Sequence, residues 1–237
     1  MSQLDEYLAA ATIDQSVFAL RPDYRALLIA VAGVRGGPSD PASDAAIQRA
    51  ESSIRTRLDG RPLEALPEIS AWREAFLDFG VKPRVARSSI EALVRRIDAG
   101  LPRIDRLTDI YNAVSVEHLV PIGGENLDRY AGSPRLVRAA GDEPFDTVAD
   151  GEQVVVTAEQ GEVVWRDDLG VTCRRWNWRQ CVRTRLDEST TNILFILDGL
   201  APMTTPALEA AGQALMDAIS SDSPDATSTV RLIDHVT

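Results

Sequence analysis

The chain has 237 residues, of which 44% are hydrophobic, and it carries a formal net charge of −11 with an isoelectric point near 4.7. This length and apolar content suffice for one large domain with a buried core. The acidic balance argues against broad electrostatic binding to nucleic acid, although it allows a local basic site. No run of about 18 apolar residues is present, and residues 1–15 lack the order of a signal peptide, so we expect a cytoplasmic protein that does not contact membranes.

The first half of the chain predicts a strand followed by helices. Residues 26–34, ALLIAVAGV, form a short apolar run closed by glycine and proline, which is typical of a buried strand. In the segment that follows, apolar residues at helical spacing lie between a cap at Ser43 and a stop at Gly60. The helices expected in this half cover residues 43–60, 68–80, 88–100 and 101–116.

The second half predicts mainly strands and one closing helix. Residues 153–167 indicate two strands around a glycine turn, and residues 171–185 indicate another strand or pair of strands. Residues 191–200 form an apolar strand, and residues 205–219 have the spacing of a helix.

These elements predict one domain of the α+β class over residues 1–220. We expect a central β-sandwich-like body, flanked by the helices of residues 43–100 and 206–219. Residues 221–237 are expected to be a flexible C-terminal segment with a possible last strand.

The residue types that usually hold metals and cofactors are scarce. The two cysteines, Cys173 and Cys181, are expected to be reduced thiols, and the two histidines, His118 and His235, are far apart in the chain. No zinc-ligand spacing, glycine-rich phosphate loop or GxSxG nucleophile motif occurs. We therefore expect no metal and no cofactor, and we do not expect a nucleophile-based hydrolase.

Two segments stand out as candidates for a site. Residues 110–130, IYNAVSVEHLVPIGGENLDRY, combine an asparagine in an apolar run, a histidine, paired glycines and carboxylates. Residues 171–185, VTCRRWNWRQCVRTR, contain five arginines, two tryptophans and no acid, which is unusual in so acidic a chain.

Together with neighbouring residues, these segments resemble a known family. The patterns are D-x-YN-x-x-S-x-x-x-x-x-P-x-GG-x-x-LD at 109–128, R-A-x-G-D-E-x-F at 138–145 and RRWNWRQ at 174–180. They resemble the B3/B4 domain of the β-subunit of bacterial phenylalanyl-tRNA synthetase, over roughly residues 13–220. That domain hydrolyses tyrosine mistakenly attached to the phenylalanine tRNA. The resemblance implies the B3/B4 fold and a freestanding editing protein, because the chain is far too short for aminoacylation.

Such hydrolysis needs an oriented water, donors for the developing oxyanion and a grip on the terminal adenosine. The catalytic candidates are Asn112, His118 and Asn177. Asn112 can donate to a carbonyl or hold a water, but it can also cap a helix end. His118 can act as a general base near neutral pH, but it follows an apolar run, where a partly buried and hydrogen-bonded histidine is common.

Four further residues of the first segment are candidates for substrate binding. Gly123 and Gly124 allow backbone N–H groups to approach a ligand, although they also fit a plain turn. Glu125 or Asp128 can bind the α-amino group of an amino acid, whereas Asp128 also fits a surface charge or a cap.

The arginine-rich segment adds Arg175, Trp176, Trp178 and Arg179 as binding candidates, because aromatic planes beside guanidinium groups suit a nucleobase or a phosphate. The alternative is a strand with tryptophans in the core and arginines paired with nearby acids, namely Asp167, Asp168 and Glu162. Glu143 either anchors Arg138 or an arginine of residues 171–185, or it contacts the ligand.

Three functions fit these residues. The first is a trans-editing hydrolase that deacylates misacylated aminoacyl-tRNA by water attack on the ester. The second is a non-catalytic module of the same fold that binds an amino acid, a nucleotide or a tRNA end, and the third is a small-molecule esterase or amidase. The expected partner is the tRNA acceptor end, with a synthetase or an elongation factor as a candidate to deliver it. All three require the two segments to enclose one cavity.

Overall fold

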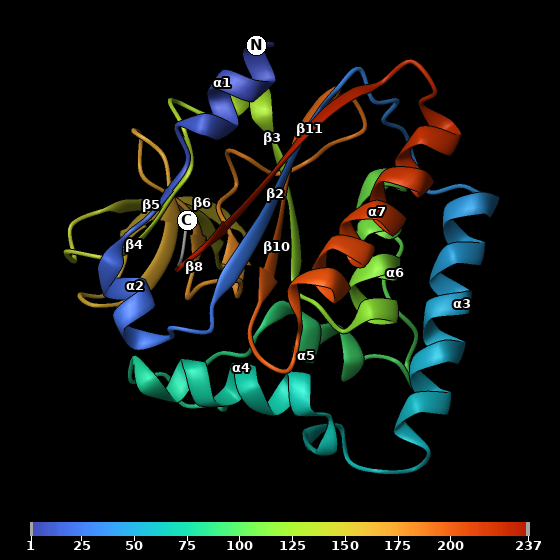
Figure 1. Ribbon diagram of the computed structural model, residues 1–237, viewed down its shortest axis with the longest axis horizontal. Helices are drawn as coiled ribbons and strands as arrows, with labels where there is room; N and C mark the ends of the chain where they lie inside the picture. Colours follow the sequence, from blue (N-terminus) through green and yellow to red (C-terminus); the bar gives the residue numbers. More distant parts are fainter. Residues whose placement is uncertain (1, 236–237) are drawn as a thin grey trace.

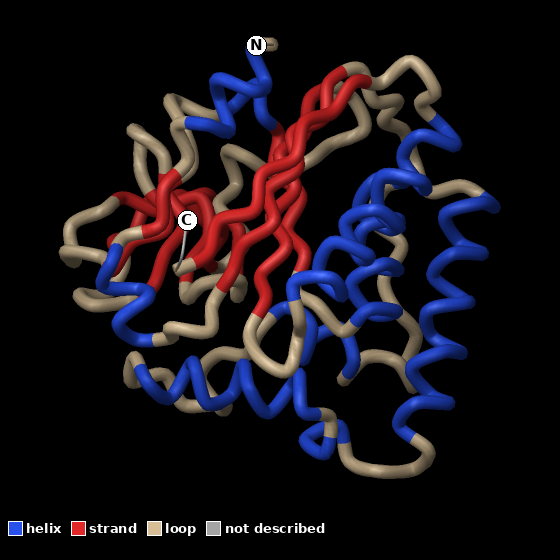
Figure 2. The backbone as a smooth tube through the Cα atoms, in the orientation of Figure 1, coloured by secondary structure: helices blue, strands red, loops and turns tan. Residues whose placement is uncertain are grey.

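The structure, a computed structural model, describes residues 2–235. Its strands gather in the centre and on one side together with the two N-terminal helices, and the remaining helices cover the other side and the base (Figure 1, Figure 2). An antiparallel sheet, here called sheet B, lies between another sheet, sheet A, and a layer of helices. The protein is therefore of the α+β class, with a sandwich-like body flanked by helices, as the sequence predicts.

Sheet B is built around a strand that is buried on both faces. Alternate side chains of a strand point to opposite faces, so its continuous apolar run fills two layers of core. Leu27 belongs to the cluster shared with the helical layer, whereas Leu28 belongs to the cluster shared with sheet A. The strand order is β11 (Thr227–Asp234), β2 (Arg25–Ala32), β10 (Asn192–Gly199) and β3 (Ile122–Asn126), with β2 as the doubly buried strand.

Sheet A is less regular, and a separate hairpin lies beside it. The β1–β4 pair is parallel and the other pairs are antiparallel. The strand order of sheet A is β1 (Thr12–Ile13), β4 (Arg135–Arg138), β7 (Val163–Arg166), β8 (Val171–Arg174) and β9 (Arg179–Gln180). The hairpin consists of β5 (Pro144–Ala149) and β6 (Glu152–Thr157).

The two strands expected around a glycine turn within residues 153–167 are present, but they do not pair with each other. Strand β6 pairs with β5, whereas β7 pairs with β4 and β8. The reason lies in the preceding turn, where Asp150 and Gly151 have φ values of 51° and 85° and close a tight hairpin. An Asp-Gly pair between strand-forming residues is a strong hairpin signal, and it outweighs the later glycine turn.

The helices expected at 43–60, 68–80 and 205–219 begin and end within a few residues of these bounds. The helix expected at 88–100 ends already at Val94, and the helix expected at 101–116 begins only at Arg106. Helix α3 starts one turn before the expected cap, because the Asp40 carboxylate accepts the N–H groups of Ala42 and Ser43, while Ser43 Oγ accepts the Asp40 N–H at 3.1 Å. The helices are α1 (Gln3–Ala9), α2 (Gln15–Leu20), α3 (Pro41–Leu58), α4 (Pro67–Asp78), α5 (Ser89–Val94), α6 (Arg106–His118) and α7 (Thr205–Asp222), with short 3-10 turns at Leu63–Ala65 and Leu127–Arg129.

Helix α6 is the helix that positions the candidate site. It packs between α3 and sheet B, beside α7, and it is buried along nearly its whole length (Figure 1). The Asp105 carboxylate caps its start by accepting the Thr108 N–H at 2.8 Å. Leu119 ends it in the left-handed conformation, with a φ of 52°. The chain then turns directly into β3, so the helix and this strand bring their polar residues to one place.

The chain returns to sheet B near its C-terminus. Strand β11 pairs antiparallel with β2 from Thr227 opposite Ala32 to Asp234 opposite Arg25. The last strand anticipated in the sequence is thus an edge strand of sheet B. Within residues 2–235, no helix combines the length and the apolar content needed to cross a bilayer.

Candidate functional site

A cavity of about 230 Å³ opens between α5, α6, β3, β10 and the β8–β9 hairpin. The first candidate segment contributes three of its predicted residues to the wall, and the arginine-rich segment contributes four. They are Asn112, Gly123, Glu125, Trp176, Asn177, Trp178 and Arg179. Segments about fifty residues apart in the sequence therefore line the same cavity, as expected.

The turn between β8 and β9 carries the second wall of the cavity. Arg175 and Trp176 have φ values of 47° and 67°, which side chains other than glycine rarely adopt. Two buried contacts hold this conformation: Arg175 N–H donates to Glu162 Oε1 at 2.8 Å, and Trp176 N–H donates to the Val163 carbonyl at 2.7 Å. The turn is therefore fixed from behind by β7 and the residue before it, and it places Asn177 at the cavity.

Glu125 on β3 forms part of the buried floor of the cavity. The side chain is 1% exposed, and its Oε2 accepts the Tyr130 hydroxyl at 2.7 Å and the Thr184 hydroxyl at 2.9 Å. Burial raises the pKa of Glu125 to about 7, although these hydroxyl donors lower it. The carboxyl is therefore close to half-ionised near neutral pH and has no cationic partner among the described residues.

Asp198 at the end of β10 is a second buried carboxyl in the wall. Its Oδ1 accepts the Tyr24 hydroxyl at 2.6 Å, and its Oδ2 accepts Nδ2 of Asn177 at 3.2 Å. Burial raises the pKa of Asp198 to about 7, with the negative charge of Glu125 as a smaller contribution in the same direction. Because the Asn177 side chain donates its Nδ2 hydrogen bond to Asp198, the amide oxygen of Asn177 points away from Asp198.

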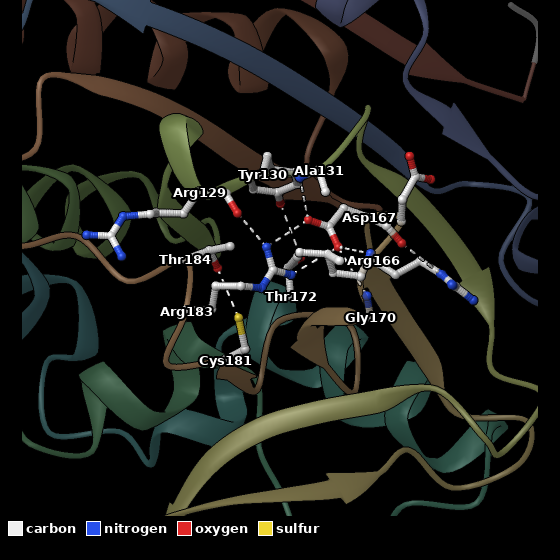
Figure 3. A network of polar contacts seen from close by, with 12 residues as sticks. Arg129, Tyr130, Ala131, Arg166, Asp167, Gly170, Thr172, Cys181, Arg183 and Thr184 are labelled. Carbon is white, nitrogen blue, oxygen red and sulfur yellow. Dashed lines mark hydrogen bonds and ion pairs between the residues drawn. The ribbon is translucent and has the colours of Figure 1, made fainter.

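Figure 3 shows a network of polar contacts around Asp167 and Arg183. It is connected to Glu125 through the Tyr130 and Thr184 hydroxyls. The Asp167 carboxylate is fully buried. It accepts two hydrogen bonds from the Arg183 guanidinium, at 2.9 and 3.0 Å, and one from the Ala131 N–H, at 2.8 Å. The neighbouring Tyr130 hydroxyl, which binds Glu125, also lies 3.1 Å from Thr172 Oγ1. Glu125 at the floor is thus connected, through Tyr130 and the adjacent Ala131, to the Asp167–Arg183 ion pair, in which the two charges balance each other.

Several buried polar atoms of cavity-lining residues have no hydrogen-bond partner within residues 2–235. They are Ser89 Oγ, Trp165 Nε1, Trp176 Nε1 and Asn177 Oδ1. Leaving such atoms unpaired costs about 1–3 kcal/mol each, and a ligand that pairs with them removes this cost. The cavity wall therefore offers both donors and acceptors to a polar ligand.

Cys173 also lines the cavity, but it is poorly suited to act as a nucleophile. Burial raises the pKa of its thiol well above the usual value, and the charges of Glu125 and Asp198 act in the same direction. Thiolates are the reactive form of cysteine, and this environment disfavours them. Cys173 is therefore not a candidate nucleophile.

The mouth of the cavity has the opposite charge to its floor. Arg96, which follows α5, and Arg179, which starts β9, are both exposed and both line the cavity. The Arg179 guanidinium lies 4.5 Å from the centre of the Trp178 ring. The cavity thus runs from a cationic entrance to an acidic floor.

Three predicted residues of the first segment do not line this cavity. His118 lies half-buried at the end of α6, where burial lowers its pKa. Gly124 faces Tyr111, and a Cβ there would lie 2.9 Å from the Tyr111 ring, so this glycine allows close packing of α6 on β3. Asp128 accepts Nδ2 of Asn192 at 2.8 Å and lines a separate cavity beside α1.

Two other predicted binding residues form internal ion pairs away from the cavity wall. Glu143 accepts the N–H groups of Ala140 and Gly141 and lies 3.5 Å from Arg166, rather than from Arg138 or the arginine-rich segment. Arg175 donates to Glu159 at 2.9 Å.

The alternative interpretation of the arginine-rich segment is correct for two of its other arginines. Arg174 pairs with Glu162 and Arg183 pairs with Asp167.

Sequence reasoning missed several residues of the wall. Asp198 belongs to an apolar run that predicts only a strand, and Arg96 belongs to a segment that predicts only a helix packed on the core. A carboxylate that interrupts a buried apolar run, as in ILFILDG, is a signal that could have identified Asp198. Trp165 and Tyr111 carry no comparable signal, because a buried aromatic residue is ordinary core.

Comparisons with known proteins give a family match and a structural neighbour. A family model described as B3/4 domain matches residues 71–213. No curated protein matches the chain. A crystal structure of an N-terminal fragment of the phenylalanyl-tRNA synthetase β-subunit from Pyrococcus horikoshii is similar, with 14% sequence identity and a TM-score of 0.47. The match covers 94% of this chain and 50% of that chain, so this chain spans about half the length of its neighbour.

Proposed function

Because the chain belongs to the B3/4 domain family, whose model matches residues 71–213, we propose that it hydrolyses the ester bond of misacylated aminoacyl-tRNA. The observation that carries the proposal is the charge arrangement of one cavity, with Glu125 and Asp198 buried at the floor and Arg96 and Arg179 at the mouth. An aminoacyl-tRNA end has the matching arrangement, with an ammonium group on the amino acid and phosphates on the nucleotides.

Glu125 binds the α-ammonium group of the amino acid in this proposal. The group is buried and lacks a cationic partner, and its two short hydrogen bonds both end on Oε2. A bound ammonium supplies the missing positive charge and stabilises the carboxylate. Asn112 lines the same cavity from α6 and donates to the ester carbonyl, whose oxygen gains negative charge during the reaction.

Asn177 orients the attacking water. Its Nδ2 donates to Asp198, and its Oδ1, which has no partner within residues 2–235, is available to accept a hydrogen bond from the water. The water oxygen forms a bond to the carbonyl carbon, the ester C–O bond breaks, and the ribose oxygen leaves with a proton. One proton of the water goes to the leaving ribose oxygen, and the other is released to solvent because the carboxyl group of the free amino acid is ionised at neutral pH. The products are the free amino acid and the uncharged tRNA.

The decisive experiment is a deacylation assay with purified protein on a set of tRNAs charged with wrong amino acids, including tyrosine, serine and threonine. The wild-type protein should release at least one of them, and Glu125→Gln should lower kcat/KM about a hundredfold because the ammonium loses its partner. Glu152→Gln, on the exposed hairpin strand β6, is the matched control. Activity on no charged tRNA, or full activity of Glu125→Gln, would overturn the proposal.

The pH dependence gives a second check on the same assay. A protonated Glu125 cannot pair with an ammonium group, so kcat/KM should rise with pH through about 7, the pKa of the free carboxyl. A profile that is flat between pH 6 and 8 would contradict this role of Glu125.

A binding module is the second candidate, because a free amino acid also carries an ammonium and a carboxylate that match the floor and the mouth. Tight binding of an amino acid in a thermal-shift assay, without release from any tRNA, would favour this module. Equal rates on simple amino-acid esters and on aminoacyl-tRNA would favour a small-molecule esterase. Because a deacylase needs access to charged tRNA, we propose that the protein acts in the cytoplasm.

A further inference from the structure

Most arginines near the cavity are neutralised inside the protein. Arg174, Arg175 and Arg183 each lie within 3.0 Å of a carboxylate oxygen, on Glu162, Glu159 and Asp167 respectively. Ion pairing is the rule for this chain, which has 36 acidic and 25 basic residues. Arginines in this segment therefore mainly stabilise the fold, and they leave little positive charge for a partner.

Arg96 and Arg179 are different. Both are exposed, both line the cavity, and neither forms an ion pair with any residue that the structure describes. They come from elements that are joined directly, because Ser89 N–H at the start of α5 donates to the Asn177 carbonyl at 3.1 Å. Two uncompensated guanidinium groups therefore border one opening, on elements that are fixed to each other.

Trp178 orients one of these guanidinium groups without neutralising it. Its ring centre lies 4.5 Å from Cζ of Arg179 and 4.4 Å from Cζ of Arg175. Arg175 is held by Glu159, whereas Arg179 interacts with the aromatic ring alone. Such stacking leaves the N–H groups at the edge of the guanidinium plane available to a planar or tetrahedral anion.

We propose that Arg96 and Arg179 bind the phosphodiester groups of the last nucleotides of tRNA, so that they dock the acceptor end at the cavity mouth. The proposal rests on the deacylase function and goes beyond it by naming the partner surface. With the ammonium group at Glu125, the ester lies inside the cavity and the nucleotide phosphates fall at its entrance, where these arginines lie. The net charge of −11 confines the favourable contact to this rim.

The test compares two substrates that share the same aminoacyl-adenosine ester but differ in whether the tRNA chain, with its phosphates, is attached. One is an aminoacyl-tRNA, and the other is the same amino acid esterified to adenosine, which has no phosphate. In the double variant Arg96→Gln/Arg179→Gln, the ratio of kcat/KM for tRNA to kcat/KM for the adenosine ester should fall at least about tenfold, and the dependence of KM on salt should weaken. Arg84→Gln is the matched control, because Arg84 is exposed and unpaired in the described chain but does not line the cavity.

The outcomes separate this proposal from the deacylase function. If the ratio of kcat/KM values is unchanged in an active double variant, the proposal that Arg96 and Arg179 bind the phosphates is wrong, whereas the deacylase function still holds. If the ratio falls equally in Arg84→Gln, the proposal is also wrong, because loss of positive charge anywhere on the surface then explains the effect.

A binding measurement tests the rim even if the wild-type protein cleaves no ester. Fluorescence anisotropy with a labelled CCA trinucleotide should show at least about tenfold weaker binding for the double variant, and binding unaffected by the two substitutions overturns the rim.

Discussion

Two kinds of buried carboxylate lie within the same core. Glu162 and Asp167 each bind an arginine and at least one backbone N–H group. Glu125 and Asp198 are just as deeply buried and line the cavity, but within residues 2–235 they bind uncharged donors and no cationic group. Glu162 and Asp167 are therefore neutralised by the protein itself, whereas Glu125 and Asp198 have no counter-charge among the described residues.

The difference separates structural carboxylates from candidate functional ones. A buried charge that the protein itself neutralises stabilises the fold, and its removal leaves the partner unpaired. A buried carboxyl without a cation has a raised pKa and gains charge stabilisation only when a cationic ligand arrives. Substitutions at the two pairs should therefore have opposite effects on stability.

The largest effect is expected at the neutralised pair. Asp167→Asn should lower the free energy of unfolding by about 3–5 kcal/mol in urea denaturation, because it leaves the Arg183 guanidinium without its counter-charge. Asp168→Asn is the control, since Asp168 has a side-chain exposure of 61% and pairs with Arg135 at the surface. The control should lose less than about 1 kcal/mol. Equal losses in the free energy of unfolding for the two variants would contradict a structural role of the buried Asp167–Arg183 pair.

The opposite sign is expected at Asp198. Its folded pKa of about 7 exceeds its ordinary value of 3.8, so the stability it contributes is present at acidic pH and is lost as pH rises toward 7. Asp198→Asn removes the cost of burying this charge, and Asn177 can turn its free amide oxygen toward the new side-chain nitrogen. The variant should melt at least about 2 °C above the wild type at pH 8, with a smaller difference at pH 5. Thermal denaturation across that range measures it; a difference that shrinks with rising pH would contradict the assignment.

The smallest effect is expected at Tyr130. Its hydroxyl donates to Glu125 and lowers the pKa of that carboxyl, so Tyr130→Phe should raise this pKa further. The rise of kcat/KM should move to higher pH, by about one unit or less, with a few-fold loss at pH 7 that is recovered above pH 8. Tyr7→Phe is the control, because Tyr7 packs on Tyr130 but its hydroxyl has no partner in the described chain. A shift of equal size in both variants would point to packing rather than to the hydrogen bond.

Sequence patterns predicted most of the helices and the central strands because these elements carry local signals. Strand β2 is a closed apolar run, and α3 and α7 have apolar residues at helical spacing. The start of α3 was misplaced by a few residues because Asp40 and Ser43 are both good caps. The Asp-Gly turn at 150–151 was a local signal that the sequence analysis overlooked.

The site was predictable only in part, because a sequence segment does not show which way each side chain points. The two segments were identified by unusual composition, and they do line one cavity. Arg174 and Arg179 look alike in the sequence, yet one binds Glu162 in the core and the other faces the cavity mouth. That assignment depends on the left-handed turn at Arg175 and Trp176, which no local pattern predicts. Asp198 faces the cavity because of the register of β10 against β2 and β3, which is a property of the whole sheet.

The pairing of β2 has a consequence for the synthesis of the protein. Its two neighbours, β10 and β11, lie about 160 and 200 residues later in the chain. During translation, this apolar strand therefore leaves the ribosome long before either neighbour exists. Sheet B cannot close, and Asp198 cannot reach the cavity, until most of the chain has been made. Contacts so distant in sequence slow folding, and a nascent chain with an unpaired apolar strand is the state in which a chaperone would be most needed.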